Sequence, residues 1–176
     1  MTESHPDRQA ASLVGAPIKQ IAFVVDDIEA AIRSWADHMG VGPWSAYTLG
    51  PPRLREMVYR GETAEFSFRH ALAWSGPLQL ELVQPLTGPG IFADHLQAHG
   101  PGVQHIGIVV PDHAGACATL AEHGYTPLQS GAGFGLDGTG RFAYFEPPAG
   151  IGTVIELIDP PKARAEAEFV YPGGDA

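Results

Sequence analysis

The segment "KQIAFVVDDIEAAIRSWADHMG", residues 19–40, returns later in the chain as "QHIGIVVPDHAGACATLAEHG", residues 104–124. Both copies run from an apolar strand through an aspartate into a helix that closes on alanine, an acidic residue and histidine. Laid over one another, the copies place Gln20 on His105. Internal similarity of this kind indicates a duplicated supersecondary unit whose copies pack together. We therefore expect two copies of one module.

A second pair of strands extends the repeat. The segment "LQLELVQP", residues 78–85, aligns with "TVIELIDP", residues 153–160, and Glu81 falls on Glu156. Each glutamate interrupts a nearly continuous apolar run, which is typical of a strand that is covered on both faces. A buried carboxylate needs a proton, a cationic partner or a metal ion, because burying an uncompensated charge is very unfavourable. No Lys or Arg stands at a locally paired spacing, so a shared metal ion is the favoured partner.

The local patterns predict a βαβββ order in each copy. The first copy predicts a helix over about 28–38, capped by Asp27, and strands at 18–25, 44–48, 55–60, 64–73 and 78–84. The second copy predicts a helix over 112–123 and strands at 104–110, in the glycine-rich segment that follows, at 141–146 and at 153–158. The tail after Pro161 is expected to start helical and to end frayed. The expected units are an N-terminal extension (1–17), a first module (18–88), a linking helix (89–102), a second module (103–161) and a C-terminal tail (162–176).

The size and charge of the chain exclude several classes of protein. A length of 176 residues suits one compact unit. A formal charge of -10 and a pI near 5.1 would repel a phosphate backbone, so we expect no nucleic-acid partner. No stretch approaches the roughly 18–20 apolar residues of a membrane span, and residues 1–15 lack the apolar core of a signal peptide. We expect a cytoplasmic protein that binds a small molecule and no membrane.

The repeat also predicts a metal site. Side chains alternate between the two faces of a strand, so Gln20 and His105 each face the same way as the residue two positions later. If the modules pack with pseudo-two-fold symmetry, the pairs Gln20/His105 and Glu81/Glu156 meet around one axis. An amide oxygen, an imidazole nitrogen and two carboxylates form a ligand set for one divalent ion. A mixed set without thiolate suits Zn, Mn, Co, Ni, Fe(II) or Mg.

The motifs "KQIAFVVDDIEAAI", "LELVQP", "QHIGIVVPD" and "GTVIELID" resemble the vicinal oxygen chelate superfamily, which includes glyoxalase I, methylmalonyl-CoA epimerase, extradiol dioxygenases and the fosfomycin and bleomycin resistance proteins. The resemblance covers about residues 18–160. It implies an α+β fold in which two paired βαβββ modules form a curved mixed sheet with a metal-binding cleft, and by analogy a homodimer. The family's ligand positions fall on Gln20, Glu81, His105 and Glu156. This set is similar to that of glyoxalase I, whereas the linking helix resembles that of the epimerases.

The implied chemistry is proton abstraction. A divalent ion that binds two substrate oxygens polarises a carbonyl and stabilises the enolate formed when the adjacent carbon loses a proton. Glu156 is the first candidate for the base, with Glu65 or Glu81 opposite it. Glu65 is a candidate for the second base because the epimerases that this sequence resembles use a glutamate that does not bind the metal, and Glu65 lies at a similar spacing before the "LELVQP" strand. An isomerase, an epimerase and a lyase all remain possible. The expected substrate-binding residues are two aromatic wall residues and two cations: Phe66, Tyr144, Arg69 and Arg141.

Two alternatives to this metal-dependent enzyme stay open. A metal-free binding or drug-sequestering protein of the same fold commonly lacks the ligands, whereas all four positions here hold competent donors. An Fe(II) ring-cleaving dioxygenase normally needs two histidines and a carboxylate, and Gln20 replaces the first histidine. Cys117 is interpreted as a small core residue. The remaining strand and helix histidines are interpreted as helix or surface residues: His38, His70, His95, His99, His113 and His123.

Overall fold

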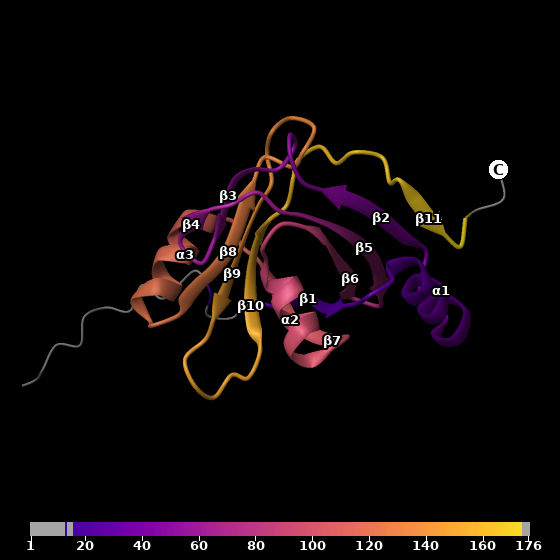
Figure 1. The fold of residues 1–176 in the computed structure, drawn as a ribbon, viewed down its shortest axis with the longest axis horizontal. Coiled ribbons are helices and arrows are strands. Elements are labelled where there is room, and N and C mark those ends of the chain that lie inside the picture. The colour runs from indigo at the N-terminus through magenta and orange to yellow at the C-terminus, as the bar shows by residue number, and fades with distance from the viewer. Residues whose placement is uncertain (1–12, 14–15, 174–176) are drawn as a thin grey trace, which may run out of the picture.

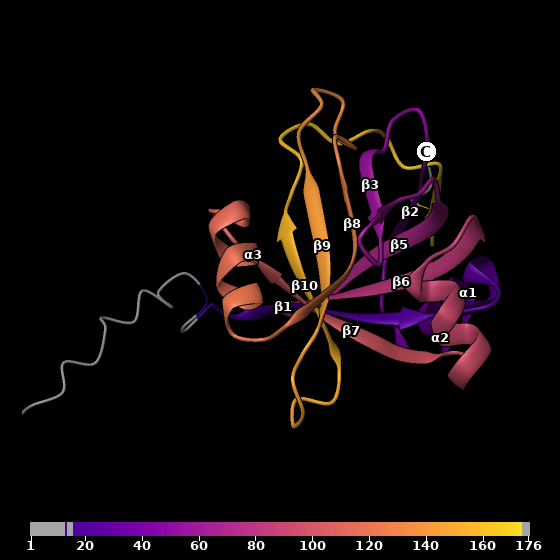
Figure 2. The same ribbon diagram turned by 60° about the vertical axis from the view of Figure 1, so that its left-hand side comes forward.

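The computed structural model describes Leu13 and residues 16–173, which form one curved sheet flanked by helices (Figure 1, Figure 2). The first module contains β1 (Ile18–Val24), α1 (Ile28–Met39), β2 (Trp44–Leu49), β5 (Ser67–Ser75) and β6 (Leu78–Thr87). After α2 (Ile91–His99), the second module contains β7 (Gly102–Val109), α3 (His113–Glu122), β8 (Thr126–Ala132), β9 (Arg141–Glu146) and β10 (Val154–Asp159). Three strands lie outside this repeat: β3 (Arg55–Tyr59), β4 (Glu62–Thr63) and β11 (Phe169–Tyr171). The predicted α+β fold with two βαβββ modules is confirmed.

The two modules join at the centre of a single sheet. Its strands follow the order β11-β2-β5-β6-β1-β7-β10-β9-β8-β3-β4. At the junction β1 and β7 pair antiparallel, and Gln20 lies opposite Gly107. In each module the last strand runs parallel to the first, β6 beside β1 and β10 beside β7. Read outward from the junction, both halves therefore follow the same order, as pseudo-two-fold symmetry requires.

The repeated aspartates begin the two outer helices. The Asp27 carboxylate accepts hydrogen bonds from the backbone N–H groups of Glu29 and Ala30, each at 3.0 Å. The Asp112 carboxylate accepts one from the backbone N–H of Gly115 at 3.0 Å. These acceptors satisfy amide groups that the first turn of a helix leaves without partners. Both helices consequently start within one residue of their predicted positions.

The alternation of side chains gives the sheet an outer and an inner face, each with its own core. On the outer face, α1 covers the first module through Ile32 and α3 covers the second through Leu120. On the inner face, both modules contribute to a third core. Phe92 of α2 enters this core, with ring centroids 5.1 Å from Phe68 and 5.5 Å from Tyr144. The linking helix therefore packs into the inner face, where the predicted ligands lie.

Two segments cross from one module to the outer edge of the other. The β3–β4 hairpin leaves the first module after β2 and pairs through β3 with β8 of the second. The C-terminal tail, yellow in Figure 1, leaves β10 and pairs through β11 with β2 of the first module. The prediction of a helix at the start of the tail is wrong, because residues 162–168 contain no helix and lead into β11. Each crossing gives an otherwise open edge strand a hydrogen-bonding partner.

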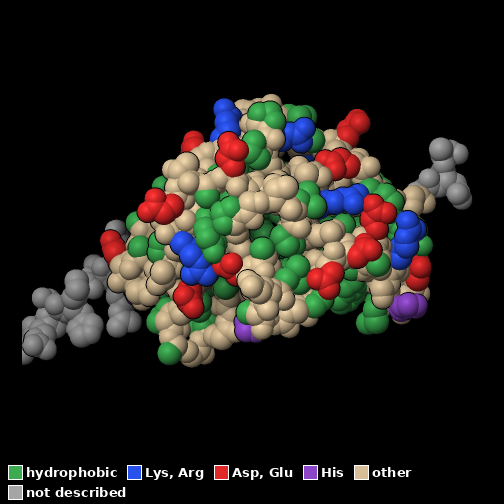
Figure 3. Space-filling model, in the orientation of Figure 1, with side chains coloured by type: hydrophobic (Ala, Val, Ile, Leu, Met, Phe, Trp, Pro, Cys, Tyr) green, Lys and Arg blue, Asp and Glu red, His purple; other side chains and the backbone are tan. Residues whose placement is uncertain are grey.

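The surface charge is dispersed. On the face of the described residues in Figure 3, Lys and Arg side chains stand among Asp and Glu side chains and form no continuous basic patch. This distribution agrees with the formal charge of -10. Among the described helices, none has the length and apolar character needed to cross a membrane.

Candidate metal centre

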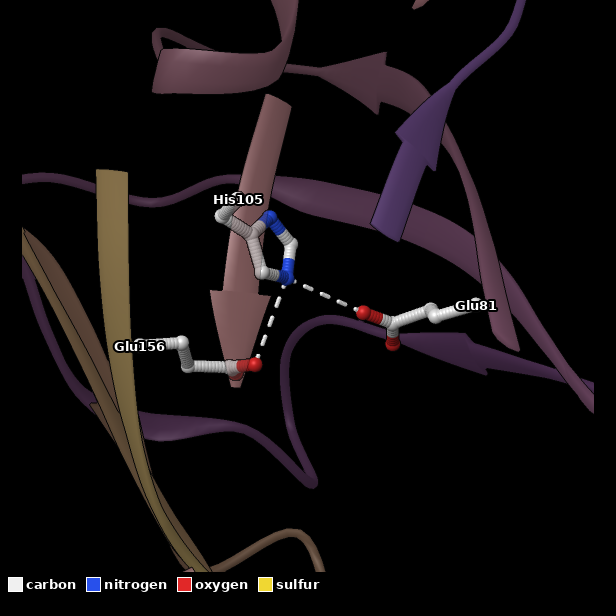
Figure 4. A group of neighbouring side chains, drawn as sticks. All are labelled: Glu81, His105 and Glu156. Carbon is white, nitrogen blue, oxygen red and sulfur yellow. Dashed lines mark hydrogen bonds and ion pairs between the residues drawn. The ribbon is translucent and has the colours of Figure 1, made fainter. Parts of the chain in front are cut away.

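Three of the four predicted ligands converge on the inner face of the sheet (Figure 4). His105 Nε2 lies 3.2 Å from Glu81 Oε2 and 3.3 Å from Glu156 Oε2. One ligand atom from each residue lies within 4.8 Å of the other two, so the three side chains have the spacing of a metal-binding group. All three side chains are buried, and His105 is 0% exposed.

The sheet itself aims these side chains at one another. Glu81 lies on β6, His105 on β7 and Glu156 on β10. The leucines on either side of Glu81 belong to the outer core under α1, so the carboxylate between them points inward. The apolar neighbours of Glu156 pack under α3 in the same way. The apolar runs that first drew attention to the two glutamates are thus the reason that both reach the inner face.

Gln20 lies on β1, between the strands that carry Glu81 and His105, and is 4% exposed. Its Nε2 donates a hydrogen bond to Gln79 Oε1 at 2.9 Å, which orients the amide. Its Oε1 lies over Gly107, where an added Cβ would approach it to 2.7 Å. Gly107 is also the residue opposite Glu156 across β7 and β10. Because glycine has no side chain, Gly107 leaves room for the Gln20 carbonyl group next to the strand that carries Glu156.

This donor set fits a divalent cation. Two buried acceptors in the site lack a well-formed hydrogen bond among the described residues: Gln20 Oε1, and Glu156 Oε2 apart from its 3.3 Å contact with His105 Nε2. A buried polar group left without a partner costs about 1–3 kcal/mol, and a cation bound between these oxygens would remove that cost. Two carboxylates also balance the charge of a divalent ion. The combination of oxygen donors with one imidazole suits Zn, Mn, Co, Ni, Fe or Mg.

Two further side chains orient the cluster, and sequence reasoning missed both. His105 Nδ1 donates to Gln104 Oε1 at 2.6 Å, which leaves Nε2 facing the carboxylates. His70 Nδ1 donates to Glu81 Oε1 at 2.7 Å. Partners of this kind fix the tautomer and direction of metal ligands. The interpretation of His70 as a surface or helix residue is wrong, because it is buried on β5; its alternation with Phe68 and Leu72 was a usable signal.

Burial and charge move the pKa values of the cluster in different directions. Burial favours neutral Glu81, but hydrogen bonds from His105 and His70 outweigh it and lower the pKa of Glu81 to about 2. Burial likewise acts to lower the pKa of His105, yet its two carboxylate neighbours raise it to about 9. For Glu156, burial dominates and raises the pKa. In the metal-free protein, Glu81 is thus the ionised carboxylate and Glu156 the one with increased proton affinity.

These shifts predict opposite pH dependences for stability and for metal binding. The folded pKa of His105, about 9, exceeds its ordinary 6.5, so its stabilisation is complete below pH 6.5 and disappears as the pH rises to about 9. The folded pKa of Glu81, about 2, lies below its ordinary 4.5, so its stabilisation is complete above pH 4.5 and disappears as the pH falls toward 2. These two groups together give the metal-free protein its greatest stability from pH 4.5 to 6.5. The raised pKa of Glu156 removes stability as the pH rises above 4.5, so it favours the lower end of that range.

Metal affinity should instead rise from pH 6.5 to 9, because a ligand histidine must lose its proton. Urea unfolding of chelator-treated protein and calorimetric titration with Zn²⁺, both as a function of pH, measure the two trends. Parallel slopes in the two experiments would contradict the assignment of His105 as a ligand.

The cluster lies at a cavity of about 430 Å³. Gln20, His70, Glu81, Tyr144 and Glu156 line it with a mainly apolar wall, while His105 lies beside Phe92. The other apolar wall residues are Leu49, Phe68, Leu72, Trp74, Val109, Phe134, Phe142, Ile158, Pro160 and Pro161. One chain supplies the whole cavity, so the predicted homodimer is not needed to complete it and stays a prediction.

Both arginines predicted to bind substrate lie away from the cavity. Arg69 alternates to the outer face, where its guanidinium forms an ion pair with Glu29 of α1 at 2.9 Å. Arg141 is exposed and forms an ion pair with Glu56 at 3.1 Å. Neither side chain lines the cavity that contains the carboxylates. The structure therefore does not bring these two arginines to the candidate site.

The other predicted residues divide between cavity and exterior. Tyr144 lines the cavity, as expected of a substrate-binding residue. Phe66 is buried in the inner core and does not reach the cavity wall. Glu65, predicted as a second base, is exposed and precedes β5, which begins only at Ser67. The β5 side chain that contacts Glu81 is His70 instead.

Removal of the His70 donor should weaken metal binding. His70→Phe keeps a ring but leaves Glu81 Oε1 without its hydrogen bond, and loss of such an orienting partner typically lowers metal affinity by about 10- to 100-fold. His70→Gln retains an N–H donor and should recover part of the loss. Competition for Zn²⁺ against a chelating dye measures the affinities. Equal affinity in the parent and both variants would show that His70 does not position Glu81.

Comparison with known proteins places this geometry in context. A family model described as Glyoxalase/Bleomycin resistance protein/Dioxygenase superfamily matches residues 19–145. A search of curated proteins found no match to the chain.

Several solved structures share the fold. Methylmalonyl-CoA epimerase from Mycobacterium tuberculosis is 22% identical over 81% of this chain and 87% of its own, with a TM-score of 0.57. A hypothetical protein from Bacillus halodurans is 20% identical over 85% and 97% of the two chains, with a TM-score of 0.58. A mutant of 4-hydroxymandelate synthase from Streptomyces coelicolor is 18% identical over 89% of this chain and 42% of its own, with a TM-score of 0.58. Similarity at these identities establishes the fold alone.

Proposed function

This chain belongs to the glyoxalase/bleomycin resistance protein/dioxygenase superfamily, and from that premise we propose that it is a metal-dependent enzyme that removes a proton next to a carbonyl group. Its reaction is that of an isomerase, an epimerase or a lyase acting on a small molecule. The main support is the buried cluster of Glu81, His105 and Glu156, in which two carboxylates face one imidazole. Beside it, Gln20 Oε1 is buried without a hydrogen-bond partner among the described residues.

The residues of the site hold the ion, and one of them, Glu156, is also proposed to move a proton. Glu81, His105, Glu156 and Gln20 are the proposed ligands. When bound, the divalent ion polarises the substrate carbonyl and stabilises the negative charge that develops on its oxygen. Glu81 stays ionised because its pKa is lowered to about 2. His105 presents Nε2 to the site because Gln104 accepts the hydrogen bond of Nδ1.

Glu156 is the proposed base. In the metal-free protein burial raises its pKa, the direction that makes a carboxylate a better proton acceptor. The carboxylate takes the proton from the substrate carbon and returns it to the same face or to a neighbouring atom. A single base suits isomerisation or elimination. Epimerisation would need a second proton carrier on the opposite face, and the cavity-lining His70 on β5 is the candidate.

The alternatives have less support. The similar structures include both methylmalonyl-CoA epimerases and 4-hydroxymandelate synthase, so the choice of reaction class rests on the residues of the site. An Fe(II) dioxygenase site normally has two histidines, whereas the cluster contains His105 alone. In a metal-free binding protein, Glu81 and Glu156 would be buried without a cation between them other than protonated His105. Such burial is costly and has no evident use in ligand sequestration.

Metal content and proton exchange test the proposal together. Purified protein should hold about one divalent ion per chain, measured by elemental analysis. With a screen of oxo acids, thiohemiacetals and CoA thioesters in deuterated water, at least one compound should exchange a carbon-bound proton, and a chelator should abolish the exchange. Tight binding of a small molecule that is indifferent to chelator, with no exchange in any compound, would favour the sequestering protein instead.

A further inference from the structure

Charge is distributed unevenly along the cavity that contains the proposed metal ligands. Its two carboxylates, Glu81 and Glu156, are buried. Its two cationic wall residues, Lys19 and Arg164, are exposed. The exposed residues mark where the cavity opens to solvent. The carboxylates and the cations therefore line one cavity, with Lys19 next to the proposed ligand Gln20 on β1 and Arg164 on the segment that follows β10.

No ion pair joins Lys19 or Arg164 to a carboxylate in the part of the chain that the structure describes. Elsewhere in the same residues, arginines do form such pairs, as Arg69 does with Glu29. The chain carries a formal charge of -10, so carboxylate partners are abundant. Two cations at the opening that remain without one are available to an anion from solution.

A series of ring contacts relates Arg164 to the candidate metal centre. The Arg164 guanidinium lies over the Tyr47 ring at 5.4 Å from its centroid. The Tyr47 and His70 ring centroids are 5.6 Å apart, and His70 Nδ1 contacts Glu81. The sum of the Arg164–Tyr47 and Tyr47–His70 distances is therefore an upper limit on the distance from the Arg164 guanidinium to the His70 ring. This upper limit is consistent with a ligand body of one or two aromatic rings between Arg164 and the candidate metal centre.

Arg164 is also held in place on an anchored segment. Residues 160–168, which we call the strap, connect β10 to β11. At one end, Ala163 O accepts a hydrogen bond from the backbone N–H of Leu136 at 2.8 Å. At the other end, the Glu168 carboxylate accepts hydrogen bonds from Thr48 N at 3.0 Å and Thr48 Oγ1 at 2.8 Å. The backbone that carries Arg164 is fixed before any ligand arrives, which lowers the entropic cost of binding.

The wall between the two charged ends is apolar. It consists chiefly of aliphatic and aromatic side chains from both modules. At the opening, Trp74 is 57% exposed and Val109 is 42% exposed. A ligand that covers these large apolar side chains removes their surface from water, which favours binding. The cavity therefore offers an apolar surface between the buried carboxylates and Arg164, against which the hydrophobic part of a ligand can pack.

We propose that the substrate is an amphipathic organic anion of one or two rings, with two neighbouring oxygens at one end and a single anionic group, such as a carboxylate, at the other. The oxygen pair faces Glu81 and Glu156, the ring body packs against the apolar wall, and the anionic group contacts Arg164. This substrate class rests on the proposed function, since the oxygen pair needs a metal ion.

Matched hydroxamic acids test this arrangement by binding alone. Biphenyl-4-hydroxamic acid and its 4'-carboxy derivative both offer two adjacent oxygens, and only the second carries a distal anion; benzohydroxamic acid and its 4-carboxy derivative form a shorter pair. Calorimetry on Zn²⁺-loaded protein should show that at least one carboxylated probe binds about fivefold more tightly than its neutral partner, as expected for a partly exposed ion pair. Added salt should reduce this preference.

Variants identify the groups responsible. Arg164→Gln should weaken the carboxylated probe by about two- to fivefold and leave the neutral probe unchanged. Lys162→Gln is the matched control, because Lys162 is exposed on the same strap, carries the same charge and does not line the cavity. It should alter neither probe.

The outcomes separate this proposal from the proposed function. If both members of each pair bind equally in every protein, the anion site is wrong, while metal-dependent hydroxamate binding still supports the function. If the carboxylate preference persists after chelation, the anion site stands and the metal role is wrong. If no probe binds with or without Zn²⁺, both proposals are overturned.

Discussion

Glu156→Gln is expected to lower turnover by about two to four orders of magnitude, the usual effect of removing a positioned general base. Glutamine matches glutamate in size and keeps an oxygen that can face the ion, so the fold and much of the metal binding should survive. The variant cannot accept a proton at neutral pH. Exchange of a substrate proton with deuterated water, measured alongside metal content, distinguishes loss of the base from loss of the ion.

Glu65→Gln is the matched comparison for this prediction. It makes the same chemical change at an exposed position outside the cavity, so turnover should stay close to that of the parent protein. A large loss in Glu65→Gln with normal activity in Glu156→Gln would reverse the assignment of the base. A metal content that falls in proportion to activity in Glu156→Gln would instead make Glu156 a ligand only.

His105→Ala should both abolish tight metal binding and destabilise the protein. It removes the single nitrogen donor of the cluster and leaves Glu81 and Glu156 buried without the cation between them. Removing one partner of a buried ion pair typically costs about 3–5 kcal/mol. Urea unfolding of chelator-treated protein at pH 7 measures the loss, and elemental analysis measures the metal.

The pH dependence identifies the cause of that destabilisation. If it arises from uncompensated carboxylates, it should shrink as the pH falls, because protonation neutralises them. His38→Ala is the control, since His38 is exposed on α1 and the change should leave stability nearly unaltered. An unfolding free energy that drops equally at all pH values would point to lost packing rather than lost charge compensation.

The internal repeat carried most of what could be predicted. Aligned positions in two copies indicate which strands pair and which faces meet. The four proposed metal ligands could therefore be predicted without knowledge of any contact: Gln20, Glu81, His105 and Glu156. The neighbours of the glutamates were informative for the same reason, because an apolar residue on each side leaves a strand side chain only the opposite face. Helix starts followed from the repeated capping aspartates.

The remaining features depend on contacts that local patterns do not encode. His70 reaches Glu81 across two neighbouring strands, and its own segment shows only alternation. Arg69 was assigned to the site by composition, although the same alternation places it on the opposite face from His70. The pairing of β3 with β8 and of β11 with β2 joins distant parts of the chain. Short strands such as β11 leave no periodic signal from which to predict a partner.

The crossing segments limit how a substrate can enter. The β3–β4 hairpin and the strap tether each module to the far rim of the other through main-chain hydrogen bonds. A clamshell motion that swings the modules apart about β1 and β7 would have to break both tethers at once. A substrate should therefore enter past exposed wall residues such as Trp74 and Arg164 without separation of the modules, and the chemistry can proceed within a scaffold whose halves keep a constant separation.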